Sequence, residues 1–111
     1  TVVGFVEPND AIAAEIHDAL GLKRISSVAQ LVKQVDCAIV STPTTAHFDV
    51  ARELMEAGCD VMVEKPITST VDEARRLIDI AKKNKRIITV GHCERYNPAI
   101  MAVADLVRET R

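Results

Sequence analysis

Lys65 is the residue whose type and position most directly suggest chemistry. It lies in the triplet Glu64-Lys65-Pro66, which ends the short apolar run Val61 to Val63. Short apolar runs of this kind are typical of strands that a parallel sheet buries on both faces. Open α/β sheets bind their ligands at the carboxyl ends of such strands. We therefore predict that Lys65 belongs to a binding site, the alternative being a surface lysine before a turn.

Three further polar segments each follow an apolar run. They are Glu7 after residues 2–6, Ser41 to Thr45 after residues 37–40, and His92 to Asn97 after residues 87–90. If the runs are parallel strands, their carboxyl ends share one edge of the sheet, and the polar segments should meet in one crevice. Loops are generally polar, but Lys65 and Arg95 at the same edge favour a functional site.

Helical periodicity alternates with the apolar runs, which predicts a parallel α/β sheet. Five polar positions are expected to cap helices, namely Asn9 or Asp10, Ser27, Thr44 or Thr45, Thr70 and Asn97. The apolar residues expected to face inward are Ile12, Ala13, Ile16, Ala19 and Leu20, then Val28, Leu31 and Val32, then Val50, Ala51, Leu54 and Met55, then Val71, Ala74, Leu77, Ile78 and Ala81, and finally Ile100, Val103, Ala104 and Val107.

Composition excludes several classes of protein. The 111 residues form one domain at most, and with 48% hydrophobic but 3% aromatic residues its core must be aliphatic. A net charge of −2 gives no electrostatic reason to expect nucleic acid or an anionic membrane as a partner. No apolar run approaches the roughly 20 residues of a membrane span. Cys37, Cys59 and Cys93 are isolated, which indicates reduced thiols in a cytoplasmic protein. The consecutive residues His92, Cys93 and Glu94 cannot close a tetrahedral metal site by themselves, so we expect no metal.

An ordered set of motifs runs through the chain. They are Thr42-Pro43-x-x-x-His47-x-x-x-Ala51, Gly58-x-x-Val61-x-x-Glu64-Lys65-Pro66, and Gly91 followed by Arg95-Tyr96-x-Pro98. Together they resemble the nucleotide-binding half of the glucose-fructose oxidoreductase and inositol 2-dehydrogenase family. The resemblance implies a Rossmann-type doubly wound parallel sheet, with residues 1–111 as a partial NAD(P)-binding domain. The segment from Gly91 to Pro98 is most similar to members that act on nucleotide-linked amino sugars.

The resemblance also implies an activity. Members of the family transfer hydride between a nicotinamide cofactor and a carbinol carbon of a sugar, cyclitol or sugar nucleotide. Hydride leaves such a carbon only as the hydroxyl proton is lost, so a cation beside the oxygen stabilises the developing alkoxide. By resemblance Lys65 is that catalytic group, and it also orients the substrate hydroxyl. The family often has a cis peptide bond before the residue that corresponds to Pro66.

Cofactor and substrate residues follow from the same resemblance. The implied cofactor-binding residues are Glu7, Ser41, Thr42, Pro43, His47, Glu64, Lys65 and Pro66. Glu7 suits the ribose 2′-hydroxyl and favours NAD over NADP, unless it is only a solvated turn acid. Thr44 stands where the family more often has Asn. His47 could instead be a packing residue. Arg95 and Tyr96 should bind substrate where a second domain meets this one, although Arg95 could simply pair with Glu94.

Two parts of the family fold have no counterpart in these residues. The first strand with its G-x-G-x-x-G turn, which cradles the pyrophosphate, is missing, as is the C-terminal α+β domain. The missing strand would lie between residues 2–6 and 37–40, leaving unsatisfied backbone groups that cost about 1–3 kcal/mol each. We therefore expect a fragment of a longer enzyme, or a sequence restricted to ordered residues, and no catalysis by residues 1–111 alone. We also expect a homo-oligomer.

Two alternatives come from other classes of protein. A phospho-receiver signalling domain is also a small parallel α/β fold with Lys-Pro after a strand. Such a domain needs an aspartate at a strand end where this chain has Ser41-Thr42-Pro43. A non-catalytic family member that binds dinucleotide or protein for regulation is the second alternative. The presence of Lys65 disfavours it without deciding the question.

Overall fold

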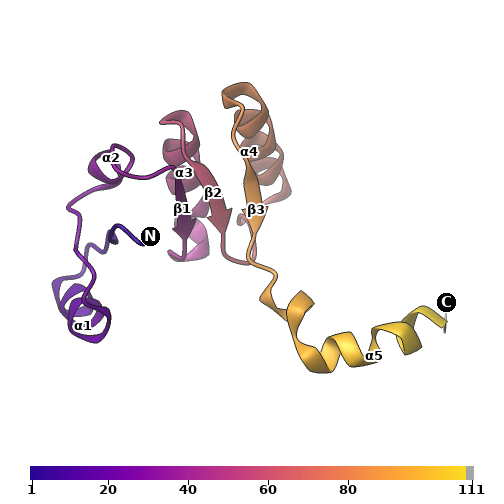
Figure 1. The fold of residues 1–111 in the computed structure, drawn as a ribbon. Helices are drawn as coiled ribbons and strands as arrows, with labels where there is room; N and C mark the ends of the chain where they lie inside the picture. The colour runs from indigo at the N-terminus through magenta and orange to yellow at the C-terminus, as the bar shows by residue number, and fades with distance from the viewer. Residues whose placement is uncertain (110–111) are drawn as a thin grey trace.

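The computed structural model describes residues 1–109, with side chains described through residue 103. Its centre is a parallel sheet of three strands in the order β1 (Cys37–Val40), β2 (Asp60–Val63) and β3 (Ile88–Val90). Two helices, α3 (Thr44–Glu56) and α4 (Val71–Asn84), connect the strands and cover one face of the sheet (Figure 1). This arrangement confirms the predicted parallel α/β fold class.

The hydrophobic core lies between the sheet and its two helices. Its largest fully buried apolar side chains include Leu54 and Met55 of α3, Leu77 of α4 and Val63 of β2. Burial of a side chain of this size stabilises the fold by about 1.5–3 kcal/mol. The core therefore holds both helices against the strands, and so fixes the loops that leave the strand ends.

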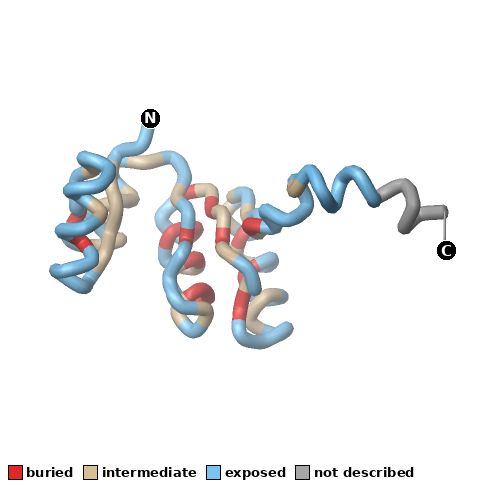
Figure 2. Tube along the Cα trace, turned by 90° about the horizontal axis from the view of Figure 1, so that it is seen from below, coloured by how far each residue is buried: buried red, intermediate tan, exposed pale blue. Residues whose placement is uncertain are grey.

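The strands are buried on one face instead of two. Val61 and Val63 are buried, Met62 between them is half-buried, and Ile39, the register partner of Met62, is 67% exposed. The prediction of a strand buried on both faces is therefore wrong for the described residues, because both covering helices lie on the same side. Figure 2 shows most buried residues gathered along this one layer, while Ala13 and Ile25 are buried in the N-terminal part.

Local sequence explains where the two covering helices begin. Thr70 and Glu73 form the predicted capping box: Thr70 Oγ1 accepts a hydrogen bond from Glu73 N (3.2 Å), and Glu73 Oε2 accepts one from Thr70 N (3.0 Å). The predicted caps Thr44 or Thr45 are wrong. Pro43 takes the N-cap position of α3, and its carbonyl oxygen accepts the hydrogen bond of Ala46 N at 2.8 Å.

The N-terminal part forms two short helices and no strand. These are α1 (Asp10–Leu20) and α2 (Val28–Leu31), with α1 set off to the side of β1 (Figure 1). The strand predicted for residues 2–6 is wrong, because pairing is confined to one parallel bridge between Phe5 and Arg24. No described strand fills the position between this segment and β1. Of the apolar stripe predicted for α1, Ala13 is buried, whereas Ile12 and Leu20 are exposed.

The C-terminal part leads away from the sheet. A short 3-10 helix, η1 (Cys93–Tyr96), is followed by α5 (Pro98–Glu109), which projects from the body of the fold (Figures 1 and 2). Asn97 caps α5 as predicted, since its Oδ1 accepts a hydrogen bond from Ala99 N at 3.0 Å. Ile100 and Val103 are exposed, so the prediction that they face inward is wrong. Ala104 and Val107 lie outside the described side chains. Within the described residues, no helix is long and apolar enough to span a bilayer.

Candidate functional site

The three strands end at the same level. Val40 is the register partner of Val63, and Val63 is the register partner of Val90. Ser41, Glu64 and Gly91 therefore follow their strands side by side along one edge of the sheet. Three of the four predicted polar segments therefore begin at this edge, whereas the groove at the third strand is lined by no residue of 41–45 or 64–66. Glu7, the fourth, lies on the loop that leads into α1.

Lys65 lies at the middle of this edge and is exposed. Its backbone N donates a hydrogen bond to Glu64 Oε2 (3.3 Å), and the bond between Lys65 and Pro66 is cis, as the resemblance implies. Among the described residues, no carboxylate forms an ion pair with the Lys65 ammonium. The charged group is therefore open to a ligand, and an ammonium can donate up to three hydrogen bonds.

The loop after β1 lies next to the Lys65 loop. Ser41, Thr42 and Pro43 are exposed, so their surface is accessible to a ligand at the sheet edge. His47 lies below them in the first turn of α3 and is buried, with 1% of its surface exposed. Its Nδ1 lies 2.9 Å from the carbonyl oxygen of Pro66, and its Nε2 lies 2.9 Å from that of Thr42. The imidazole thus contacts the backbone of both loops.

Glu7 occupies a loop that is held by its own hydrogen bonds. Glu7 Oε1 accepts a hydrogen bond from Asn9 N at 2.8 Å, and Asn9 in turn caps α1. The guanidinium of Arg24 donates to the carbonyl oxygens of Glu7 (3.0 Å) and Pro8 (3.2 Å) and to Asp10 Oδ1 (2.7 Å). Arg24 therefore fixes the backbone on which the Glu7 carboxylate stands, a role that the sequence did not reveal.

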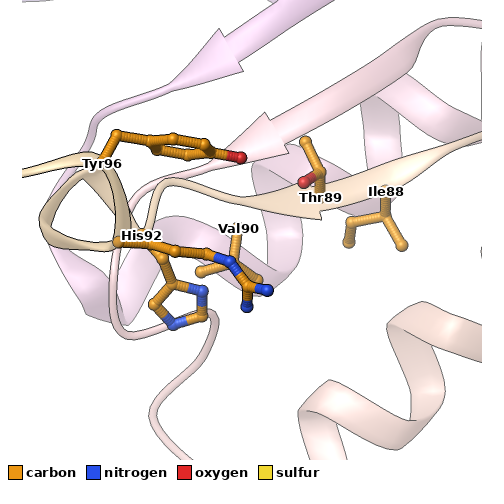
Figure 3. A pocket seen from close by; sticks show the side chains of 6 residues that line it. Ile88, Thr89, Val90, His92 and Tyr96 are labelled. Carbon is orange, nitrogen blue, oxygen red and sulfur yellow. The ribbon is translucent and has the colours of Figure 1, made fainter. Parts of the chain in front are cut away.

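Arg95 and Tyr96 line an open groove beside β3. The groove has a volume of about 510 Å³ and is lined by Ile88, Thr89, Val90, His92, Arg95 and Tyr96. Figure 3 shows the Tyr96 ring pointing in the direction of Thr89 on β3. Glu94 Oε2 accepts a hydrogen bond from Asn97 Nδ2 at 2.8 Å, and no ion pair with Arg95 occurs among the described residues. The alternative of an Arg95–Glu94 pair therefore finds no support.

Metal ligands and a perturbed thiol were the other candidate features among the described titratable groups, and neither is found at this edge. No group of three or more His, Cys, Asp and Glu side chains among the described residues could hold a metal ion. Burial raises the pKa of the Cys59 thiol, with smaller contributions from Asp36 and other nearby groups. Cys59 precedes β2, however, so it lies at the amino end of the sheet, opposite the site.

Comparison with known proteins gives one consistent result. Residues 1–92 match the family described as "Oxidoreductase family, NAD-binding Rossmann fold". The UDP-N-acetylglucosamine 3-dehydrogenase of Acidithiobacillus ferrooxidans is 36% identical over 99 residues, which cover 89% of this chain and 32% of that enzyme. The D-xylose 1-dehydrogenase (NADP(+)) of Hypocrea jecorina is 33% identical over 94 residues, covering 83% of this chain and 24% of that enzyme.

Structural comparison agrees with the sequences. A solved structure of the same Acidithiobacillus ferrooxidans dehydrogenase superposes with a TM-score of 0.85 at 34% identity, covering 95% of this chain and 35% of that one. The chain thus spans about a third or less of the length of these relatives. It forms part of a Rossmann domain, and it belongs to the oxidoreductase family of glucose-fructose oxidoreductase and inositol 2-dehydrogenase.

Proposed function

We propose that this chain is part of an NAD-dependent oxidoreductase that transfers hydride between the nicotinamide and a carbinol carbon of a sugar, cyclitol or sugar nucleotide. The observation that carries the proposal is the placement of Lys65, exposed and without an ion-pair partner among the described residues, at the middle of the carboxyl edge. This edge is where open α/β sheets bind ligands. The family membership supports the same reaction class.

Lys65 performs the protein's part of the chemistry in this proposal. The nicotinamide, when bound, supplies the acceptor or donor of the hydride. The Lys65 ammonium donates a hydrogen bond to the substrate hydroxyl, orients the carbon that bears it, and stabilises the negative charge that develops on oxygen. Glu64 directly follows β2, and its carboxylate accepts the hydrogen bond of the Lys65 backbone N.

The residues present fit one part of a dinucleotide site. Glu7 would accept hydrogen bonds from the ribose hydroxyls and would repel a 2′-phosphate, which favours NAD over NADP. Its Oε1 already accepts from Asn9 N, so the carboxylate is oriented before any ligand arrives. Ser41, Thr42 and Pro43 would lie beneath the cofactor, and Glu64, Lys65 and Pro66 beside it. Exchange of Glu7 for Ser should raise the affinity for NADPH relative to NADH, and an unchanged ratio would contradict the role of Glu7.

The substrate is proposed to be a nucleotide-linked sugar. Arg95, whose guanidinium suits phosphate oxygens, and Tyr96, which is 75% exposed, line the groove beside β3 and would contact it. The 36% identity to a UDP-N-acetylglucosamine 3-dehydrogenase supports this substrate class. We further propose a cytoplasmic homo-oligomer, which fits the free thiols of Cys37, Cys59 and Cys93 and the exposed apolar residues of α5.

A direct test uses the natural full-length protein with NAD and either UDP-N-acetylglucosamine or myo-inositol, following NADH formation by absorbance. Lys65→Met should lower kcat by about two to four orders of magnitude and leave the Kd for NADH nearly unchanged. Lys33→Met is the matched control, because Lys33 is exposed and precedes β1 at the opposite end of the sheet. Undiminished turnover by Lys65→Met would remove Lys65 from the mechanism. Binding of NADH without turnover of any carbinol would favour the non-catalytic alternative.

A further inference from the structure

His47 has both of its ring nitrogens committed to protein backbone. The ring is 1% exposed, with Nδ1 2.9 Å from the carbonyl oxygen of Pro66 and Nε2 2.9 Å from the carbonyl oxygen of Thr42. Carbonyl oxygens can only accept hydrogen bonds, so the ring must be the donor at each contact that is a hydrogen bond. A neutral imidazole supplies one such N–H, and the imidazolium supplies two. In either state the polar atoms of His47 face the protein and not a ligand.

The two carbonyl oxygens that the imidazole contacts belong to the two loops that form the candidate site at the sheet edge. Thr42 is in the loop after β1, and Pro66 directly follows Lys65 in the loop after β2. The last backbone hydrogen bond between the strands runs from Glu64 N to Val40 O at 2.9 Å. Beyond that bond the chains part into their loops, and the imidazole bridges them.

His47 belongs to a helix that is packed into the hydrophobic core. His47 lies in the first turn of α3, and Phe48 and Ala51 on the same helix are buried in the core. Arg76 of α4 lies 4.4 Å from the centre of the Phe48 ring, which ties this turn to the neighbouring helix. The packing of α3 therefore fixes the turn that carries the imidazole.

We propose that His47 is a positioning residue that sets the distance between the Thr42–Pro43 loop and Lys65. The role of Lys65 itself rests on the proposed function, whereas the bridge does not. Through Pro66 the ring fixes the backbone that carries the Lys65 ammonium, and through Thr42 it fixes the surface proposed to lie beneath the cofactor. His47 thus acts on the site without touching dinucleotide or substrate.

Two substitutions separate the two arms of the bridge. In His47→Asn the amide nitrogen can take the position of Nδ1, which keeps the polar contact with Pro66 and removes the contact with Thr42. In His47→Gln the amide nitrogen can take the position of Nε2, which keeps the polar contact with Thr42 and removes the contact with Pro66. Hydrogen–deuterium exchange of the full-length protein, read by mass spectrometry, reports on both loops without requiring turnover.

We expect each variant to loosen a different loop. Where the lost contact is a hydrogen bond, amide exchange should rise about two- to tenfold, in residues 64–68 for His47→Gln and in residues 41–46 for His47→Asn. With UDP-N-acetylglucosamine as probe, kcat should fall more in the Gln variant, and the Kd for NADH should rise more in the Asn variant.

The matched controls are His17→Asn and His17→Gln. His17 is exposed on α1, and its Nδ1 also lies 2.8 Å from a carbonyl oxygen, that of Leu22. Neither control should change exchange in residues 41–46 or 64–68. Equal loosening of both loops by both His47 variants, or no loosening by either, overturns the proposal. If the exchange pattern appears as expected but no carbinol is oxidised, the bridge stands and the proposed function fails.

Discussion

The carboxylate of Glu64 lies against Gly91, across the carboxyl ends of β2 and β3. A β-carbon at position 91 would stand 3.0 Å from Glu64 Oε1 and 3.2 Å from both Cδ and Oε2. Gly91 is buried, and its N donates a hydrogen bond to the carbonyl oxygen of Val63 at 2.8 Å. The absence of a side chain at Gly91 therefore makes the space in which Glu64 lies and from which it accepts the hydrogen bond of Lys65 N.

Gly91→Ala should displace the Glu64 carboxylate by a few tenths of an ångström and weaken its hydrogen bond to Lys65 N. We expect a loss of about 0.5–1.5 kcal/mol in the free energy of unfolding, measured by urea denaturation of the full-length protein. In a Glu64→Ala background the same exchange should cost less, because the crowded carboxylate is gone. Additive effects of the two substitutions would show that the residues are not coupled.

Lys85→Gly should stabilise the protein. Lys85 ends α4 with a φ of 55°, in the left-handed region where a side chain costs about 1–2 kcal/mol and glycine is favoured. Glycine loses more entropy on folding, so we expect a net gain of about 0.5–1 kcal/mol.

The control for this change is the same substitution at Lys83. That residue has helical geometry in the last turn of α4, where glycine should cost up to about 1 kcal/mol. Thermal denaturation of both variants should give shifts in Tm of opposite sign. Shifts of the same sign would contradict the assigned backbone geometry.

Arg24→Lys should weaken dinucleotide binding about three- to tenfold. One ammonium cannot reproduce the three contacts that the guanidinium makes to Glu7 O, Pro8 O and Asp10 Oδ1, so the Glu7 loop should lose its fixed position. Titration calorimetry of the full-length protein with NADH measures the change. Lys23→Arg, a change at the neighbouring exposed residue, should leave the Kd unaltered. Equal affinity of wild type and Arg24→Lys for NADH would show that Arg24 does not support dinucleotide binding through the Glu7 loop.

Cys59 should resist alkylation while the protein is folded. Burial raises the pKa of its thiol above the ordinary value of 9.0, and the thiolate is the reactive form. Iodoacetamide at neutral pH should label Cys37 and Cys93, which are exposed, long before Cys59. Rapid labelling of Cys59 in the native protein, detected by peptide mass spectrometry, would contradict its burial.

The same shift predicts a pH dependence of stability. Because the folded state holds the Cys59 proton more tightly than the unfolded state, the contribution to stability is fully present below pH 9.0 and is lost as the pH rises through the folded pKa. Above pH 9.0, the free energy of unfolding should therefore fall faster for the wild type than for Cys59→Ala. Parallel curves for the two proteins would remove Cys59 as the cause.

Much of the fold could be predicted from the sequence because local signals agree with the tertiary structure. The caps at Asn9, Ser27, Thr70 and Asn97 are confirmed, since each side chain accepts a hydrogen bond from its own helix. The apolar runs that became β1, β2 and β3 are confirmed within one residue. These features depend on neighbours in sequence, which the sequence itself supplies.

The predictions that are wrong concern residues whose partners are distant in the sequence. The segment predicted as a strand over residues 2–6 has strand-like residues, but among the described residues no strand pairs with it on the side facing β1. Val71 and Ile78 of α4 are 67% and 42% exposed although Leu77 and Ala81 are buried, because the sheet covers only the centre of the predicted stripe. The periodicity of a helix does not indicate the width of the surface that covers it.

The candidate site shows the same division. Lys65, Ser41 to Pro43 and the Glu64–Pro66 triplet were placed at one edge because parallel strands share that edge. The contacts of His47 could not be foreseen, because both of its acceptors are backbone carbonyls with no side-chain signal. The wall of the groove at Ile88, Thr89 and Val90 was missed because a sequence does not reveal which strand is outermost.

The outer position of β1 in the described sheet affects the solubility of the polypeptide. Cys37, Ala38, Ile39 and Val40 contain no charge and no proline, and β1 has a described neighbour only on the β2 side. Such a strand is a template for pairing with another copy, and natural sheets block it with charge, proline or a cover. Residues 1–111 made alone should therefore self-associate into insoluble aggregates, and Ile39→Lys should keep them in solution at higher concentration.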